Sequence, residues 1–163
     1  MIIAIDGTTA SGKGTIAKRL AGYYGLPHMD TGRLYRATAV AALKAGLDLT
    51  DTEAVARIAT SLDLNDFEED ELRTAGAGKA ASVVAAIPDV RRALFELQRA
   101  FAMQAGGALL DGRDIGTVIA PDADVKLWVD AAVEQRGERR WKELLRNGEK
   151  ITLEEVIGQL RIR

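Results

Sequence analysis

The sequence predicts an α/β domain in which a mostly parallel β-sheet is flanked by helices. Short apolar segments of strand length alternate along the chain with segments whose apolar residues recur every three or four positions. The first segment, 1–6, is apolar almost throughout, as is typical of a strand buried on both faces of a parallel sheet. A glycine-rich loop at 7–15 then leads into the first helix. Ligands of such sheets bind beyond the carboxyl ends of the strands, so we expect the site at that edge.

The first 30 residues predict a strand, a helix and a second strand. Met1–Asp6 is expected to be the first strand. Ile16, Leu20 and Tyr24 recur at the spacing of a helix, which glycine and proline then stop. The segment PHMD at 27–30 is expected to be the second strand.

The middle of the chain predicts helices without strands. The last of these helices begins at a proline, which is favoured at the first helical position. The acidic stretch NDFEEDE at 65–71 is expected to be a solvated surface connection. The helices are expected at about 33–45, around Val55, Ile58 and Leu62, and from Pro88 along a core stripe of Val90, Leu94, Leu97 and Phe101.

The C-terminal third returns to strands and then ends in helices. ALLD at 108–111 and VKLWVD at 125–130 are apolar enough for two more strands. A charged helix is expected at about 133–145. Thr152 and Glu155 have the spacing of a capping box and predict the start of a last helix.

Composition excludes several classes of protein. The 163 residues suffice for one domain, and the absence of cysteine excludes disulfides, thiol catalysis and zinc–thiolate sites. The net charge of −2 gives no general attraction to polymeric nucleic acid or to anionic lipid. No apolar run approaches the ~20 residues that span a membrane. We therefore expect a cytoplasmic protein in which any site for an anion is a local cluster of basic residues.

The glycine-rich loop has the spacing of a phosphate-binding loop. Its glycines allow the backbone N–H groups to turn inward, the helix that follows adds its positive end, and a lysine supplies a mobile charge. The less specific alternative is a glycine-rich turn with a surface lysine. The residues expected to bind the phosphates of a nucleotide are Gly7, Thr8, Thr9, Ala10, Ser11, Gly12, Lys13, Gly14 and Thr15.

Three further motifs follow expected strands or open expected helices. Asp30-Thr-Gly-Arg-Leu-Tyr-Arg36 follows the second strand, and Asp111-Gly-Arg-Asp-Ile-Gly-Thr117 follows the third. Ser82 and Arg91 flank the proline that starts a helix. With these motifs the chain resembles the bacterial cytidylate kinases, which are nucleoside monophosphate kinases that phosphorylate CMP and dCMP with ATP. The segments that carry the resemblance are GTTASGKGT, DTGRLYR, AASVVAAIPDVR, DGRDIGTV and PDADVKLWVDA, in family order over nearly the whole chain.

The resemblance implies a P-loop NTPase-type parallel sheet flanked by helices, with a small, mostly helical acceptor-binding lobe and a short lid. The core is expected at 1–30 and 107–131, the lobe at about 31–106 and the lid at about 132–150. The family's small β-rich insert is replaced by the acidic stretch, so the lobe should be trimmed. Family members continue past Arg163 with an aspartate–arginine motif, a strand and a helix, so one sheet edge is expected to be unpaired here. A monomer is expected.

The resemblance also implies roles for polar residues at the acceptor. Arg36 and Arg113 match the arginines that hold the acceptor phosphate, a task suited to planar guanidiniums. Ser82, Arg91 and Asp114 offer a hydroxyl, a guanidinium and a carboxylate, the three groups that suit the edge of cytosine. For Arg36 and Arg113 the alternative is a structural salt bridge, and for Asp114 a helix cap or an ion pair. The full set expected at the acceptor is Asp30, Thr31, Tyr35, Arg36, Ser82, Arg91, Asp111, Arg113 and Asp114.

Phosphoryl transfer depends on cations around the donor, and the sequence offers several. The resemblance implies that Lys13, Arg113, Arg139 and Arg140 act in catalysis, the last two from a helix that the family closes over ATP. Arg136 lies on the same side of that helix and is left open, since it could instead pair with Glu134, Glu138 or Glu143. Mg²⁺ is expected at Thr15 and Asp111, with no role for His28, Trp128 or Trp141 beyond packing.

Two alternatives to a (d)CMP kinase remain open from the sequence. One is a kinase for another small acceptor. The other is a nucleotide-binding protein whose catalysis is impaired, since the aspartate–arginine motif of the family lies outside this chain.

Overall fold

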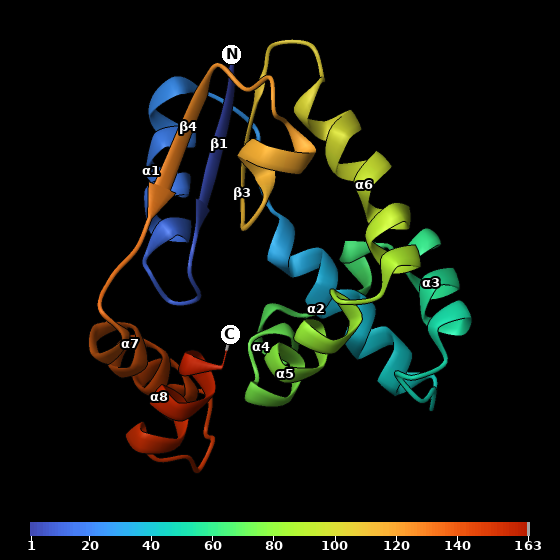
Figure 1. The fold of residues 1–163 in the computed structure, drawn as a ribbon, viewed down its shortest axis with the longest axis vertical. Helices are drawn as coiled ribbons and strands as arrows, with labels where there is room; N and C mark the ends of the chain where they lie inside the picture. The colour runs from blue at the N-terminus through green and yellow to red at the C-terminus, as the bar shows by residue number, and fades with distance from the viewer. Residues whose placement is uncertain (163) are drawn as a thin grey trace. The chain divides into compact units, whose positions relative to one another are not determined.

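The chain folds into two units, which a computed structural model describes over residues 1–162 (Figure 1). Unit 1 holds Met1–Asp30 together with the chain from Phe101 onward, and unit 2 holds Thr31–Ala100. Unit 1 contains the sheet, and within the described residues unit 2 contains only helices. In residues 1–162 no helix is long and apolar enough to cross a membrane.

The sheet of unit 1 has four parallel strands in the order β2-β3-β1-β4. Because all strands run the same way, their carboxyl ends share one edge. Ile5 of β1 is in register with Asp111 of β3, and Asp30 of β2 is in register with the same Asp111. The strands are β1 Ile2–Gly7, β2 His28–Asp30, β3 Ala108–Gly112 and β4 Val125–Val129. The strand, loop and helix predicted for the start of the chain are confirmed, as is the α/β class.

Helix α1, Lys13–Tyr24, packs on the face of the sheet formed by Ile3, Ile5 and Leu109. Its buried residues are Ala17 and Ala21, whose small side chains let the helix lie close to the strands. Ile16 and Tyr24, which mark the helical spacing in the sequence, are exposed, and the buried stripe lies one position further along.

Strand β4 lies at one edge of the sheet and is exposed along its length. Among the strands of residues 1–162, β4 pairs only with β1. Trp128 is 65% exposed, so the expectation that it packs is wrong. Lys126 donates to the carbonyl of Pro121 at 2.5 Å, and such a lysine discourages edge-to-edge pairing with another chain.

Helices α7, Val133–Arg146, and α8, Leu153–Arg161, pack on one another. The predicted capping box is confirmed, because Thr152 accepts from the Glu155 amide while Glu155 accepts from the Thr152 amide. Trp141 is half-buried and donates to the carbonyl of Ile151 at 2.9 Å. Gly137 is buried where the two helices meet, and a Cβ there would lie 2.4 Å from Cγ1 of Ile157.

Within the described residues, unit 2 consists of helices packed around one central helix. Helix α2 contacts α3, α4 and α5, so it is the centre of the unit. The helix α5 was not predicted, since two glycines interrupt its apolar pattern, but Thr74 caps it through the Ala77 amide. The helices are α2 Thr31–Lys44, α3 Thr52–Thr60, η1 Leu64–Asp66, α4 Glu69–Leu72, α5 Ala75–Val84 and α6 Pro88–Ala102.

Two expectations for unit 2 are corrected by the structure. The acidic stretch is not simply solvated, because Glu69 pairs with Arg33 at 2.6 Å and Glu71 pairs with Lys44 at 2.6 Å. These ion pairs attach α4 to α2. In α6 Leu97 is 39% exposed and does not belong to the core, whereas Gln98 is buried and donates to the carbonyl of Leu94 within its own helix.

Replacing Gly137 with alanine tests the contact between α7 and α8. The new methyl group would overlap Ile157, so we expect a loss of about 1–3 kcal/mol in the free energy of unfolding. Chemical denaturation measures this loss, and an added Ile157→Ala change should restore much of it. Gly158→Ala in α8 is the matched control: no atom lies within 4 Å of its added Cβ, and a gain of about 0.5–1 kcal/mol is expected. Equal stability of both variants would contradict the packing.

Candidate active site

The glycine loop leaves the amino end of α1 open for an anion. Gly12 precedes α1 with φ +95°, a conformation that favours glycine, and no side chain caps the helix. Ala10 also has a positive φ, of 60°, and is the only non-glycine residue of this kind among residues 1–162. Gly7 lies so close to β4 that a Cβ would stand 2.0 Å from the carbonyl oxygen of Val129. The backbone of the loop and the start of α1 therefore form a surface suited to an anion.

Ser11 gives an independent sign that the loop is built for a polar ligand. Its side chain is 5% exposed, and its hydroxyl has no hydrogen-bond partner within the protein. A buried hydroxyl of this kind costs free energy unless a ligand or water satisfies it. Lys13 begins α1 and is half-buried, and Thr15 lies exposed in the same turn. The loop thus fits the phosphates of a nucleotide.

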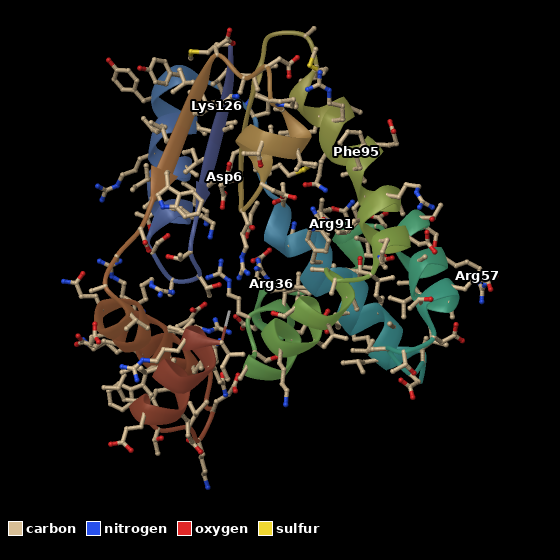
Figure 2. All side chains as sticks on the ribbon, viewed as in Figure 1. Asp6, Arg36, Arg57, Arg91, Phe95 and Lys126 are labelled. Carbon is tan, nitrogen blue, oxygen red and sulfur yellow. The ribbon has the colours of Figure 1, made fainter. Side chains whose placement is uncertain are left out.

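Asp6, which sequence reasoning missed, fixes the turn that carries two predicted site residues. Its two carboxylate oxygens accept from the amides of Ile115 and Gly116, each at 2.8 Å (Figure 2 shows Asp6). Asp6 is 8% exposed, so these bonds form with little competition from water. They hold η2, Ile115–Ile119, against the end of β1, and with it the preceding Arg113 and Asp114.

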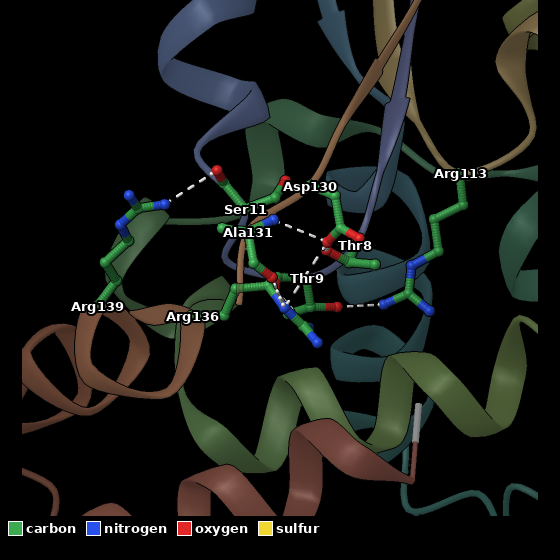
Figure 3. Close-up of polar contacts among 8 residues, drawn as sticks. All are labelled: Thr8, Thr9, Ser11, Arg113, Asp130, Ala131, Arg136 and Arg139. Atoms are coloured by element: carbon green, nitrogen blue, oxygen red, sulfur yellow. Dashed lines mark hydrogen bonds and ion pairs between the residues drawn. The ribbon is translucent and has the colours of Figure 1, made fainter. Parts of the chain in front are cut away.

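Arg113 lies against the glycine loop and donates to the hydroxyl of Thr9 (Figure 3). Partial burial of its guanidinium among the loop atoms lowers the pKa of Arg113. An arginine pKa is so high that the group stays cationic at neutral pH. Asp114 precedes η2 but makes no side-chain capping bond to it, which removes the helix-cap alternative for this residue.

Two arginines of α7 contact the backbone of the glycine loop (Figure 3). Arg136 donates to the carbonyl of Thr9 at 3.2 Å, and Arg139 donates to the carbonyl of Ser11 at 3.0 Å. Arg140 instead donates to Glu143 at 2.8 Å. Arg136 is therefore oriented by the loop, and the pairing with glutamates that the sequence left open is seen for Arg140.

Asp130, at the end of β4, connects the loop to the start of α7. Its Oδ1 accepts from the Thr8 hydroxyl at 2.6 Å and from the Ala131 amide at 2.8 Å (Figure 3). These two hydrogen bonds, the one from Thr8 being the stronger cause, lower the pKa of Asp130 below its usual 3.8. The hydrogen bond from Thr8 therefore stabilises the ionised Asp130 carboxylate in full at pH values above 3.8. This stabilisation is lost as the pH falls through the lowered pKa of Asp130.

His28 forms an ion-pair contact that sequence reasoning also missed. Its Nε2 lies 2.6 Å from Oδ2 of Asp111, whose side chain is 3% exposed. The two residues come from neighbouring strands, β2 and β3, and are 83 positions apart in the chain. Only the pairing of these strands brings them together, so no local pattern in the sequence could have revealed the contact.

The other residues predicted at the acceptor belong to unit 2. Thr31, Tyr35 and Arg36 lie on α2, which packs on α5, the helix that carries Ser82. Arg91 lies in the first turn of α6, and Figure 2 labels it together with Arg36. The exposed Ser82 hydroxyl donates to the carbonyl of Gly78 in its own helix, so its oxygen remains able to accept. Unit 1 holds the remaining predicted residues.

Comparison with known proteins identifies the family. The family model described as cytidylate kinase matches residues 3–163. The chain belongs to the cytidylate kinase family. It is 60% identical over 163 residues to a cytidylate kinase of Methylocella silvestris, with 100% of this chain and 76% of the relative covered. It is 55% identical to the cytidylate kinase of Xanthobacter autotrophicus, with 100% of this chain and 78% of the relative covered. It is 54% identical to the cytidylate kinase of Caulobacter sp. K31, with 99% of this chain and 75% of the relative covered.

Family membership makes this chain a nucleotide-binding phosphotransferase that uses ATP as its phosphoryl donor. The family and the enzyme class predicted from the sequence are thereby confirmed. The roles of individual residues, the division into core, lobe and lid, the monomeric state and the cytoplasmic location stay predictions.

Replacing Asp6 with asparagine tests the turn of η2. An amide can accept only one of the two N–H groups, so we expect one buried donor to be left unsatisfied at a cost of about 1–3 kcal/mol. Hydrogen exchange should show faster exchange of the Ile115 or Gly116 amide, and denaturation should show the loss of stability. Asp89→Asn, on the exposed first turn of α6, is the control and should change stability by less than about 0.5 kcal/mol. Unchanged protection of both amides would rule out this role for Asp6.

Proposed function

We propose that this cytidylate kinase transfers the terminal phosphoryl group of ATP to CMP or dCMP and releases CDP or dCDP. The observation that carries the proposal is the contact of Arg113 with Thr9, because it brings an arginine expected at the acceptor onto the loop that binds the donor. Such a cation can touch the phosphates of both nucleotides. Transfer breaks the bond between the γ-phosphorus and the oxygen bridging to the β-phosphate, and forms a bond to a phosphate oxygen of the acceptor.

The donor is held by the loop amides and Lys13. The open amino end of α1 and the unsatisfied hydroxyl of Ser11 support this assignment. The transition state spreads negative charge over the transferred group, so catalysis depends on positioning and on cations and needs little acid–base chemistry. Lys13, Arg113, Arg139 and Arg140 supply these cations in the proposal.

The acceptor phosphate is held by Arg36 and Arg113, each able to grip two oxygens. Asp30, Thr31 and Tyr35 belong to the same motif as Arg36 and complete this part of the proposed site. Arg113 is fixed by the turn that Asp6 holds, which supports its having a defined position before the acceptor arrives.

Cytosine is read by Ser82, Arg91 and Asp114 in the proposal. Its 4-amino group donates to a carboxylate, and its N3 and 2-oxygen accept from a guanidinium or a hydroxyl. Uracil would turn its 4-oxygen toward the Asp114 carboxylate. Both groups are hydrogen-bond acceptors, so no hydrogen bond could form between them.

Magnesium supplies charge neutralisation at the donor phosphates when it is bound, and Thr15 and Asp111 are the residues proposed to hold it. Mg²⁺ prefers oxygen ligands and usually binds through one or two protein groups, phosphates and water. Asp111 offers a buried carboxylate that His28 orients through its Oδ2.

A panel of acceptors tests the proposed activity. With ATP and Mg²⁺ present, we expect ADP release in a coupled assay with CMP and dCMP and much slower release with UMP, AMP or GMP. Addition of excess EDTA should abolish turnover. Release with a different monophosphate alone would refute the acceptor, and calorimetric binding of ATP and CMP without any turnover would indicate a binding protein instead.

Asparagine and alanine at position 114 test the reading of the base. Asp114→Ala should reduce kcat/KM for CMP far more than for UMP, because selectivity of this kind reaches about 10⁴–10⁵ when it rests on buried hydrogen bonds. Asp114→Asn should favour UMP further, since its amide can donate to the 4-oxygen. KM for ATP should change by less than about threefold. Asp48→Asn, exposed in the loop before α3, is the control, and unchanged CMP-over-UMP preference in both variants would exclude Asp114.

A further inference from the structure

Arg136 differs from the neighbouring arginines of α7 in how completely the protein engages it. Its side chain is 12% exposed although it lies in the first turn of an outer helix. Nε donates to the carbonyl of Ala131 at 3.0 Å, and Nη1 donates to the carbonyl of Thr9 at 3.2 Å. By contrast Arg139 is exposed and has one such bond, to Ser11. Two of the five N–H groups of Arg136 are thus committed to backbone acceptors.

Asp130 closes these contacts into a ring. Its Oδ1 accepts from Thr8, the residue next to Thr9, and lies 3.9 Å from Nε of Arg136. The ring therefore runs from Thr8 to Asp130, on to Arg136, and back to the loop at Thr9 (Figure 3). It joins two consecutive loop residues to the short segment between β4 and α7, more than 120 positions away in the chain.

The chemistry of the ring suits the outer side of a phosphate-binding loop. When the amides of such a loop turn inward toward phosphate, carbonyl oxygens have to face the other way. A guanidinium has donors only, so it can bind these carbonyls without competing with the ligand for the amides. Holding the carbonyls fixed keeps the amides aligned before the nucleotide arrives, and that alignment lowers the cost of binding.

We propose that Arg136 is a positioning residue that fixes the glycine loop through Thr9, and that it does not bind the phosphates of the donor. Asp130 and Thr8 keep Arg136 in place, so the three side chains act as one unit. The same ring attaches the start of α7 to the loop, which makes the base of the predicted lid a fixed point. The inference depends on donor binding by this loop and holds whichever monophosphate is the acceptor.

Binding of ADP and ATP distinguishes the two roles of Arg136. A residue that shapes the loop supports both nucleotides equally, whereas a residue that contacts the terminal phosphate supports ATP alone. In Arg136→Ala we expect calorimetry to show both affinities reduced by a similar factor, about tenfold. The ligand-free protein should lose about 3–6 °C in Tm, because the ring exists without nucleotide. Arg146→Ala, exposed on α7 and bonded to its own helix, is the matched control and should change neither quantity.

A double-mutant cycle tests the ring itself. Thr8→Val removes the hydroxyl that binds Asp130 while keeping the shape of the side chain. If the three residues act together, the loss of ADP binding free energy in the double variant Thr8→Val with Arg136→Ala should be smaller than the sum of the losses in the two single variants. Arg136→Lys, which keeps the charge but can reach only one carbonyl, should restore part of the ADP affinity and part of the Tm.

Several outcomes would overturn the proposal. These are loss of ATP affinity with ADP affinity unchanged, an unchanged Tm for ligand-free Arg136→Ala, or additive effects in the cycle. If Arg136→Ala fails to fold, Arg136→Lys and Thr8→Val carry the same comparison of ADP with ATP. A wild-type protein that binds ADP and ATP but does not phosphorylate CMP would refute the proposed acceptor and leave the role of Arg136 intact.

Discussion

The tight turn of the glycine loop is the constraint on which the rest of the site depends. The backbone can make this turn only because Gly7 passes within contact distance of Val129 and Gly12 adopts a positive φ. The carbonyls of Thr9 and Ser11 are the acceptors that the arginines of α7 use. The loop carbonyls thus bind cationic side chains, while the start of α1, which no side chain caps, suits an anion. One backbone conformation fixes the place of both.

Asp6 and Asp130 lie in equivalent positions, each at the carboxyl end of a strand. Each carboxylate accepts hydrogen bonds that fix a neighbouring segment of the chain. Asp6 accepts two amides of η2 and so defines the turn with Arg113. Asp130 accepts the Ala131 amide and the Thr8 hydroxyl and so defines the start of α7. Both carboxylates hold a neighbouring segment in place through hydrogen bonds, and Asp130 also lies 3.9 Å from Nε of Arg136. Cationic groups held in defined positions are what a site for two phosphorylated ligands requires.

The sequence predicted well those elements whose start or end is set by residues close together in the chain. The glycine loop, the proline that starts α6 and the Thr152 capping box each depend on residues within a few positions, and the structure confirms them. The contacts of His28 with Asp111 and of Thr8 with Asp130 could not be predicted, because they depend on how strands far apart in the chain pair.

Burial was predicted less well than secondary structure. The apolar spacing of α1 misses the alanines that pack on the sheet, and Trp128 lies on an exposed edge strand. The motif DGRDIGTV indicated the position of Arg113, but only the tertiary contact with Thr9 links it to the donor loop.

The net charge of −2 conceals how the charges are distributed. In unit 2 the carboxylates of α4 are paired with the basic side chains of α2, so that Glu69 and Glu71 neutralise Arg33 and Lys44. Around the loop of unit 1, Arg113, Arg136 and Arg139 donate to hydroxyl or carbonyl oxygens, which accept a hydrogen bond without cancelling a charge, and of these three only Arg136 also lies near a carboxylate, at 3.9 Å from Asp130. Neutral acceptors can orient a guanidinium while its positive field remains available to phosphate. The difference between these two kinds of partner, and not the number of basic residues, makes one part of an acidic protein attractive to nucleotides.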